Sequence, residues 1–452
     1  MESFQASGLW YVPNSPDRLV AGTLDFSRTQ GLRLRLSGVL NESISFNESH
    51  HYEAVFGLLE SSPLGRFVLA SNCLRVTYSM RMPGYATEEL TPTIAFISAQ
   101  PLENGGIEAR EAEIRLLGLD EWARVGRGLD LKTQHDDSLL FSYSQPRDLI
   151  LEIERTSCSL RFIASWLRSP STFEFHQHAA WILSFPERLS VDSIRAIWLA
   201  PFQNMLSWMI DRPSGVIDLS LIVSDKTEEA RSIHVLYSPI YWGAEEELSG
   251  HDMLVTLKDF EDSFESVVRE WWDFSGRFRR FCEVFFSLQS SPPRFVEMRF
   301  AWLLRAASAF ASAQDQKYSS HRFDTSIAAE NLSQYSSQRA EYLLSAAQEL
   351  ALPEHIESLV EQGFDLAQAI VGPSVSQFVE RILRARSAVL AGSGPTSFSG
   401  QEILWTGEQL AMLMKIAIGN QLPSLVPRLR DCFTRNSAFL HLAQRVKAGP
   451  HS

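Results

Sequence analysis

Two short segments near the C-terminal end carry residue types that could cleave RNA without a metal. "RSAVLAG" runs from Arg386 to Gly392, and "RNSAFLH" runs from Arg435 to His441. Such cleavage needs a base that takes the ribose 2′-OH proton and a fixed cation that stabilises the charge growing on the phosphorus centre. His and Arg are a sufficient pair, and DNA would be spared because it lacks the 2′-OH.

The two segments differ in what they retain. "RNSAFLH" holds Arg435, Asn436 and His441, whereas "RSAVLAG" has Arg386 and Ser387 but only Ala391 where a base would be needed. On one ideal helix, positions i and i+5 lie about 140° apart and positions i and i+6 about 240° apart. Either site therefore needs two copies of its helix meeting across a two-fold axis. An Arg followed closely by a His is a permissive pattern, so a surface Arg with an incidental neighbour explains each segment alone more simply.

Charge separates the C-terminal end from the rest of the chain. The 452 residues carry a formal charge of −13, which disfavours nonspecific binding to nucleic acid. Residues 373–452 hold nine Lys and Arg against four Asp and Glu, a charge of +5, which leaves −18 for residues 1–372. Both candidate segments lie in the basic part, although solvated Arg side chains on terminal helices are the simpler explanation of charge alone.

Other catalytic patterns are missing from the sequence. It has no phosphate-binding G-x-x-x-x-G-K-[ST], no clear dinucleotide fingerprint, no H-E-x-x-H and no G-x-S-x-G. His176 and His178 alternate on a predicted strand but have no third metal ligand nearby, and the four cysteines are too far apart for a zinc knuckle. We expect no metal and no cofactor.

The elements that must position these residues fall into two halves. Alternating apolar and polar runs between Gly8 and about Val223 predict strands of a β-sandwich or curved antiparallel sheet. The clearest runs cover residues 32–40, 65–80, 91–99, 111–119, 148–155, 159–167, 172–185 and 215–225. One helical interruption over residues 190–210 begins with a Ser/Asp cap signal.

After Asp259 the apolar spacing becomes helical. Amphipathic helices are predicted over residues 260–289, 292–313, 337–352, 355–371, 374–390, 401–419 and 422–446. The fold class is thus α+β and multidomain, with a β-rich domain at residues 1–290 and an all-α bundle at residues 291–452. No apolar segment reaches the roughly 18–20 residues of a membrane helix, and the N-terminus lacks a signal-peptide pattern, so we expect a cytoplasmic protein that makes no use of a membrane.

The order of these features resembles the ApeA-type anti-phage proteins, in which a β-rich N-terminal domain precedes a C-terminal HEPN helical bundle. The resemblance in the N-terminal half rests on the segments at residues 20–38, 52–73, 112–122 and 253–272, followed by residues 297–313. In the C-terminal half, "SQFVERILRARSAVLAG" and the later "GEQLAMLMKIAIGNQL" are similar to the part of the family where R-[NS]-x-x-x-H-G ends a helix and a long apolar helix follows.

In that register Arg386 matches the family's Arg, Ser387 its Asn/Ser and Gly392 its Gly, while Ala391 stands at the position of the catalytic His. Two explanations fit Ala391. Either a His→Ala change at position 391 was introduced to silence a toxic nuclease, or the protein is a naturally inactive member. The segment with Arg435, Asn436 and His441 stays open as the alternative catalytic site.

The resemblance implies a metal-independent HEPN endoribonuclease that works as a homodimer or a higher symmetric oligomer. It implies products with a 2′,3′-cyclic phosphate and a 5′-OH, cellular RNA such as tRNA as the target, a phage-encoded protein as a trigger, and abortive infection as the outcome. The alternative is a catalytically inactive HEPN scaffold that binds RNA or a phage or host protein. A ligand-binding β-domain with Trp10, Tyr11 and Trp122 exposed along one face is a third interpretation.

Overall fold

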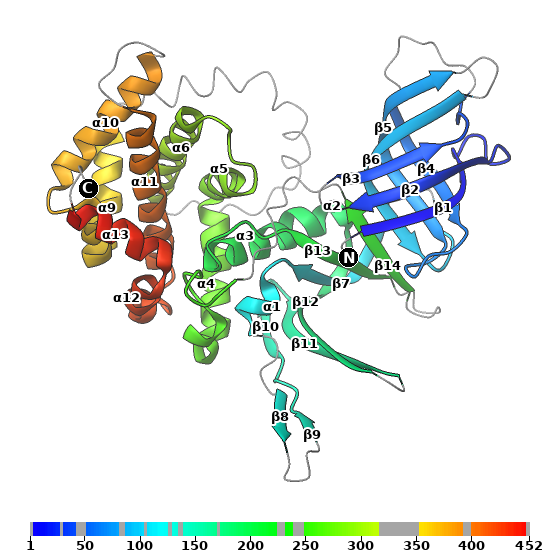
Figure 1. The fold of residues 1–452 in the computed structure, drawn as a ribbon, viewed down its shortest axis with the longest axis horizontal. Coiled ribbons are helices and arrows are strands. Elements are labelled where there is room, and N and C mark those ends of the chain that lie inside the picture. Colours follow the sequence, from blue (N-terminus) through cyan, green and yellow to red (C-terminus); the bar gives the residue numbers. More distant parts are fainter. Residues whose placement is uncertain are drawn as a thin grey trace. The chain divides into compact units, whose positions relative to one another are not determined.

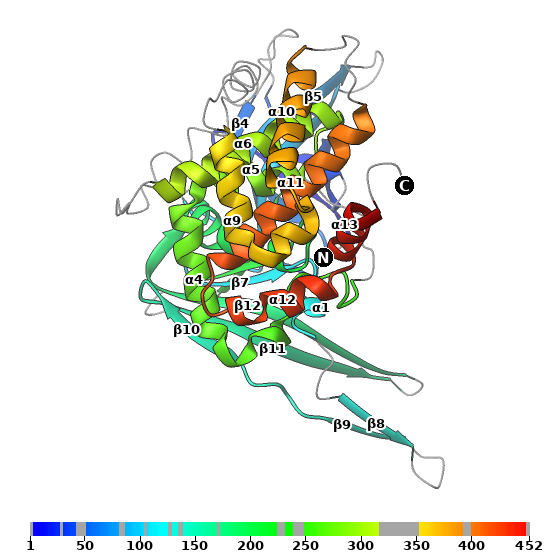
Figure 2. The ribbon, with the colours of Figure 1, turned by 90° about the vertical axis from the view of Figure 1, so that its left-hand side faces the viewer.

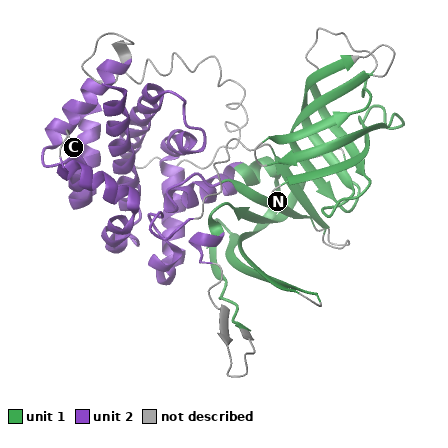
Figure 3. Cartoon of the chain, viewed as in Figure 1, with its two compact units in different colours: residues 1–119, 125–195, 215–244 green, residues 120–124, 196–214, 245–452 purple. Residues whose placement is uncertain are grey.

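The structure is a computed structural model. It describes residues 3–27, 30–41, 51–80, 86–103, 106–124, 129–133, 139–169, 172–223, 231–237, 248–315, 352–391 and 399–448. The chain divides into two compact units, coloured separately in Figure 3. The first comprises residues 1–119, 125–195 and 215–244, and the second comprises residues 120–124, 196–214 and 245–452.

Six strands of the first unit close into an antiparallel barrel. The ring runs β6-β3-β2-β1-β4-β5 and returns to β6, because β6 pairs with β3 on one side and with β5 on the other. The strands are β1 (Ser3–Tyr11), β2 (Val20–Ser27), β3 (Gly31–Leu36), β4 (His51–Leu59), β5 (Phe67–Met80) and β6 (Ala86–Ser98). Alternating burial along β1 and β3 sends every second side chain inward, as a half-buried strand requires.

The barrel interior is packed with apolar side chains around Trp10, which is fully buried. Gly57 on β4 leaves the space for its ring, since a Cβ there would lie 2.4 Å from the nearest ring carbon of Trp10. One carboxylate, Glu88, is buried in the same unit, where it accepts hydrogen bonds from the Tyr52 hydroxyl at 3.1 Å and the Leu40 amide at 3.3 Å. The barrel is therefore a filled core.

The sheet continues outward from β6 rather than ending at the barrel. Residues 94–98 of β6 pair with β14 (Arg231–Tyr237), and the order then runs β14-β13-β7-β12-β11-β10 (Figure 1). These outer strands are β7 (Glu108–Leu116), β10 (Leu149–Ile153), β11 (Thr156–Arg168), β12 (Phe173–Ser190) and β13 (Val216–Val223). A separate two-stranded sheet is formed by β8 (Leu129–Thr133) and β9 (Leu139–Tyr143).

The helical unit begins with short insertions from the N-terminal half of the sequence. These are α1 (Leu119–Trp122), whose first residue belongs to the other unit, the end of a π-helical segment η1 (Ile194–Leu199), and α3 (Ala200–Met209). The short helix α2 (Val191–Ser193) precedes η1, and the Ser190 hydroxyl caps it by accepting from the Ser193 amide. The predicted helical interruption and its cap are thus confirmed.

The remaining helices follow in sequence after the 3-10 turns η2 (Leu257–Asp259) and η3 (Glu261–Ser263). They are α4 (Phe264–Arg277), α5 (Arg279–Ser290), α6 (Val296–Asp315), α9 (Leu352–Val371), α10 (Val375–Ala391), α11 (Gly400–Asn420), α12 (Val426–Arg435) and α13 (Ser437–Ala448). Stacked and tilted rings of Trp208, Trp271, Phe274, Phe278 and Phe310 join α3, α4 and α6 in one aromatic core. Helix α11 packs against α6, α9 and α10 (Figure 2).

The predicted α+β class, a β-rich N-terminal part followed by helices, is confirmed. The curvature of the sheet goes far enough to close a barrel. The boundary expected at residues 290/291 lies inside the helical unit, and the division into 1–290 and 291–452 stays a prediction. The helix predicted over residues 337–352 lies outside the described residues, apart from Leu352.

The helical spacing over residues 260–289 is confirmed by α4 and α5. Two expectations were wrong. The helix predicted over residues 422–446 is two helices, α12 and α13. The ligand-binding face is not formed either, because Trp10 and Trp122 are both 0% exposed. Burial of these rings in packed cores, rather than display on a surface, is what their large apolar area favours.

Candidate functional site

Helix α10 carries the first candidate segment in its last two turns. Ser374 precedes the helix, and its hydroxyl accepts from the Gln377 amide at 3.3 Å, as an N-cap does. The inner face packs into the helical unit through Phe378, Ile382, Ala385 and Ala388, all buried. This apolar stripe holds α10 against the core, while Arg384 and Ser387 lie on its exposed side.

Three arginines, Arg381, Arg384 and Arg386, lie on α10. Arg386 is half-buried, while Arg384 is exposed and pairs with Glu380 at 3.7 Å. Arg381 lies with its guanidinium 5.3 Å from the centre of the Phe378 ring, and burial, reinforced by the like charge of Arg384, lowers its pKa. Successive helix residues turn by about 100°, so Arg384 and Arg386 lie on nearly opposite sides of α10, and the three arginines do not share one surface.

Ser387 is exposed, and its hydroxyl donates to the Leu383 carbonyl at 2.9 Å one turn earlier. Its oxygen therefore remains able to accept a hydrogen bond from another group. Ala391 is the last residue of α10, and the loop expected after it lies outside the described residues. A regular helix leaves Arg386 and position 391 about 140° apart, so one copy of α10 does not bring them together.

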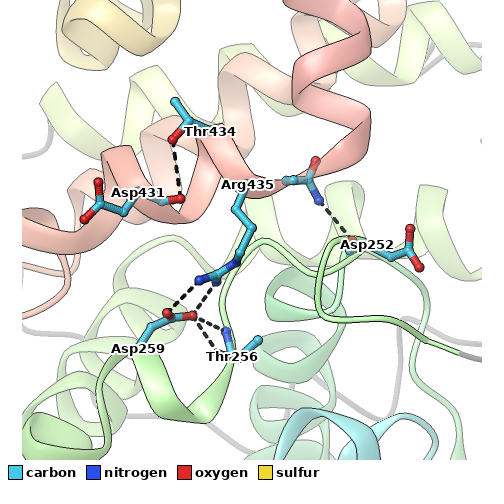
Figure 4. A network of polar contacts seen from close by, with 7 residues as sticks. Asp252, Thr256, Asp259, Asp431, Thr434 and Arg435 are labelled. Carbon is cyan, nitrogen blue, oxygen red and sulfur yellow. Dashed lines mark hydrogen bonds and ion pairs between the residues drawn. The ribbon is translucent and has the colours of Figure 1, made fainter.

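The second candidate segment differs because its Arg435 is held in a bidentate ion pair with Asp259, which we call the clasp (Figure 4). The Arg435 guanidinium donates to both oxygens of Asp259, from Nη1 at 3.0 Å and from Nη2 at 2.6 Å. Thr256 donates to the same carboxylate from its amide at 2.7 Å and its hydroxyl at 2.8 Å. Burial alone would raise the pKa of Asp259, but these hydrogen bonds outweigh it and hold the pKa below its usual range.

Asn436 forms the corner between two helices. It is fully buried, its side-chain oxygen accepts from the Phe439 amide at 2.9 Å, and its side-chain nitrogen donates to the Asp252 carbonyl at 2.9 Å. The Ser437 amide donates to the His251 carbonyl at 2.8 Å. These contacts stop α12 and start α13, so Arg435 and His441 lie on different helices and the assumed one-helix spacing does not apply.

His441 is exposed on α13, whereas Arg435 is two-thirds buried in its ion pair. The geometry gives Arg435 and Asn436 structural roles at this corner. Their assignment with His441 as an alternative catalytic site stays a prediction, because its second copy would have to come from another chain.

A cavity of about 620 Å³ lies beside the clasp. It is lined by three stretches of the helical unit that are far apart in sequence: Glu121, Arg124, Leu248, Gly250, His251, Met253, Thr256, Lys258, Asp259, Arg428 and Arg435. Sequence reasoning missed Arg124, Lys258 and Arg428, because no spacing links positions that meet only through tertiary packing. Clustered basic side chains around a concave surface are able to hold an anion.

His176 and His178 on β12 were considered as metal ligands. His176 lies 3.4 Å from Glu174 and is exposed, while burial and the charge of Arg115 lower the pKa of His178 to about 4. Within the described ranges, no group of three or more His, Cys, Asp or Glu side chains could hold a metal ion. In that same part of the chain, no helix is both long enough and apolar enough to cross a bilayer.

Comparison with known families identifies the N-terminal half. Residues 5–271 match the family described as ApeA N-terminal domain 1. Because the match spans more than half of the chain, this protein belongs to the ApeA family, and the resemblance found in the N-terminal half of its sequence is confirmed. An ApeA N-terminal domain indicates a protein of anti-phage defence. Searches of curated proteins and of solved structures gave no match.

The family match runs over the barrel, the outer strands and α3, and it ends at Trp271 within α4. It therefore includes the cavity residues from Glu121 to Asp259 and stops before α10, α12 and α13.

Proposed function

We propose that this protein is a bacterial anti-phage defence protein whose helical part is a metal-independent HEPN endoribonuclease. It cleaves cellular RNA, with tRNA as the first candidate, by attack of the ribose 2′-OH, and the cleavage causes abortive infection. The chain with Ala391 is then an inactivated form of that enzyme. The observation that carries the proposal is the position of "RSAVLAG" at the C-terminal end of α10, in a chain with an ApeA N-terminal domain.

The surroundings of α10 support this assignment. Arg386 places a cation in the last two turns of α10, which suits an RNA phosphate, whereas the chain as a whole is acidic. Arg386 would stabilise the negative charge that develops on the phosphorus centre. A His at position 391 would take the 2′-OH proton, and Ser387, whose oxygen is free to accept, would orient the phosphate or a side chain of the second copy.

The test is cleavage of 5′-labelled total tRNA in EDTA by the protein and by its Ala391→His variant. We expect cleavage only by Ala391→His, with a 2′,3′-cyclic phosphate on the product. Adding Arg386→Ala to Ala391→His should reduce the rate by about 100-fold or more, the scale of losing one charge-stabilising group. Candidate phage proteins are included in parallel reactions, because a trigger is part of the proposal.

Arg384→Ala in the Ala391→His background is the matched control. Arg384 lies on the same helix, is exposed and pairs only weakly with Glu380, so its removal should leave most of the activity. If the unmodified protein already cleaves and His441→Ala stops it, the site is at Arg435 and His441 instead. If no version cleaves with any trigger, the nuclease proposal fails.

The second candidate is a catalytically inactive scaffold that binds RNA or a phage or host protein. A specific observation favours it: alanine at position 391 provides no base, and the complete alternative pair has its Arg held by Asp259. Cleavage by the Ala391→His variant would exclude the scaffold as the function of the protein with His at that position. RNA binding by the unmodified protein, together with no cleavage by Ala391→His, would support the scaffold.

A further inference from the structure

We propose that the cavity beside the Arg435–Asp259 clasp is a binding site for a small organic phosphate of nucleotide size that carries at least two negative charges. This inference goes beyond the proposed nuclease function and does not depend on it. The cavity lies within the helical unit, and its charge is argued from the lining residues that the structure describes.

The charges around the cavity are unbalanced. Among the described lining residues, Arg124, Lys258, Arg428 and Arg435 face two carboxylates, Glu121 and Asp259, which gives these residues a net charge of +2 with His251 neutral. Asp259 is already neutralised by Arg435 through two hydrogen bonds. The remaining three cations therefore outnumber the one remaining carboxylate.

These three cations are also unpaired. The side chains of Arg124, Lys258 and Arg428 make no hydrogen bond or ion pair with any residue that the structure describes. Like charges that line one concavity raise each other's electrostatic energy, and an anion placed between them removes that cost. In a chain of charge −13, such a cluster is not what the average composition would produce.

The backbone holds the cations in place from three separate segments. Arg124 sits just after α1 with φ of 54°, in the left-handed region that non-glycine residues seldom adopt, and its amide donates to the Glu121 carbonyl at 3.1 Å. Lys258 lies in η2, whose capping box joins Thr256 and Asp259. Arg428 lies in the first turn of α12, which is tied to that segment by Arg435.

Size and lining narrow the class of ligand. A volume of about 620 Å³ falls within the range of about 300–1,000 Å³ typical of small-molecule sites and is far larger than one inorganic phosphate needs. Arg side chains bind phosphate oxygens in pairs, and Lys is a compact charge that suits the same group. Leu248 and Met253 add apolar surface for the organic part of the ligand. A nucleoside polyphosphate meets all of these requirements.

The test is isothermal titration of the full-length protein, as it stands, with ATP, GTP and pyrophosphate, and with adenosine as the uncharged control. We expect saturable binding of a nucleotide, no binding of adenosine, and affinity that falls as salt rises. Lys258→Gln and Arg428→Gln should each weaken the binding by about tenfold or more, the effect of losing one charge-assisted contact. Both side chains are exposed, so the variants should keep the thermal stability of the parent protein.

Arg430→Gln is the matched control. Arg430 is exposed on the same helix two residues after Arg428 but does not line the cavity, so its variant should bind like the parent. An equal loss with Arg430→Gln would mean that binding follows net charge and would overturn the proposal. Absence of saturable binding for all three phosphate probes up to about 1 mM would overturn it, as would binding of a 12-nucleotide single-stranded RNA in place of them. None of these outcomes bears on cleavage by Ala391→His.

Discussion

The Asp259 carboxylate accepts four hydrogen bonds from two distant parts of the chain. Two come from Thr256, three residues before it, and two come from Arg435, 176 residues later. The bond from the Thr256 amide belongs to the capping box at η2, and the distant pair ties η2 to the end of α12. A bidentate Arg–carboxylate pair fixes the orientation of both side chains as well as their charges. Asp259 thereby holds Arg435 in place along the lining of the proposed nucleotide cavity.

We predict that Asp259→Asn lowers the free energy of unfolding by about 2 kcal/mol at pH 7, between the values typical of surface pairs and of fully buried pairs. The pKa of Asp259 in the folded protein lies below the ordinary value of 3.8. Its stabilising contribution is therefore fully present above about pH 5 and is lost as the pH falls below about 4. Urea titrations at several pH values measure the difference between the two proteins.

The control is Asp431→Asn, a change on the exposed surface of α12 outside the clasp. It should alter the free energy of unfolding by less than about 0.5 kcal/mol. A difference between parent and Asp259→Asn that stayed constant down to pH 2 would contradict the assignment, because protonation of Asp259 in the parent removes the charge that the variant already lacks.

At the scale of elements, the barrel closes around one large ring. Trp10 of β1 is fully buried, and a Cβ at Gly57 of β4 would come within 2.4 to 2.8 Å of three of its ring carbons. The backbone at Gly57 and the Trp10 ring fit closely against each other. Strand β4, which carries Gly57, is fixed by its pairing with β1 on one side and with β5 on the other. Close-packed interiors tolerate added volume poorly.

Gly57→Ala should therefore destabilise the protein by about 1–3 kcal/mol through overpacking against Trp10. Gly106→Ala is the matched control, because no atom lies within 4 Å of a Cβ at that position. Thermal unfolding of the two variants, followed through tryptophan fluorescence, makes the comparison. Equal melting temperatures for both variants would show that the barrel adjusts at no cost.

The corner between α12 and α13 depends on one buried amide. Asn436→Ala removes the cap at the Phe439 amide and leaves the Asp252 carbonyl without its donor, so we predict a loss of about 2 kcal/mol in the free energy of unfolding. Thr434→Ala, which removes only an exposed hydroxyl bonded back to the Arg430 and Asp431 carbonyls of the same helix, should be nearly neutral. Chemical denaturation of both variants gives the two values, and similar losses would refute the capping role.

At the scale of the whole molecule, the proposed nuclease site needs more than one chain. Arg386 and position 391 lie about 140° apart on α10, so a site made of both takes one residue from each of two copies related by a two-fold axis. Neither the unmodified protein nor a variant with Arg386→Ala and Ala391→His together contains both groups in one chain. Each should therefore be inactive alone.

Mixing these two inactive proteins should restore cleavage. Random exchange gives hetero-dimers in about half of the pairs, and each hetero-dimer has one complete site of two, so we expect about a quarter of the activity of Ala391→His. Gel assays with labelled tRNA after co-refolding measure it. No activity in the mixture, when Ala391→His by itself is active, would mean that both groups act from the same chain.

The sequence by itself determined eight of the strands and the change from strands to helices near residue 259. Alternation such as Leu32, Leu34 and Leu36 follows from the two-residue period of a strand, and each of the eight predicted runs overlaps one strand of the structure, whereas β1, β2, β4, β8, β9 and β14 were not among them. It also determined the family, because the order of these elements and their local motifs are properties of the linear chain.

Only the tertiary structure decided how far the sheet curves and what meets in space. Closure of the barrel depends on β6 pairing with both β3 and β5, and strand pairing between distant segments leaves no periodic mark in the sequence. The end of α12 at Arg435 was also hidden, because helical spacing continues past it and the break comes from the Asn436 amide reaching Asp252. The cavity lined by Arg124, Lys258 and Arg428 exists for the same reason: side chains 134 and 170 residues apart become neighbours only when the core beneath them is packed.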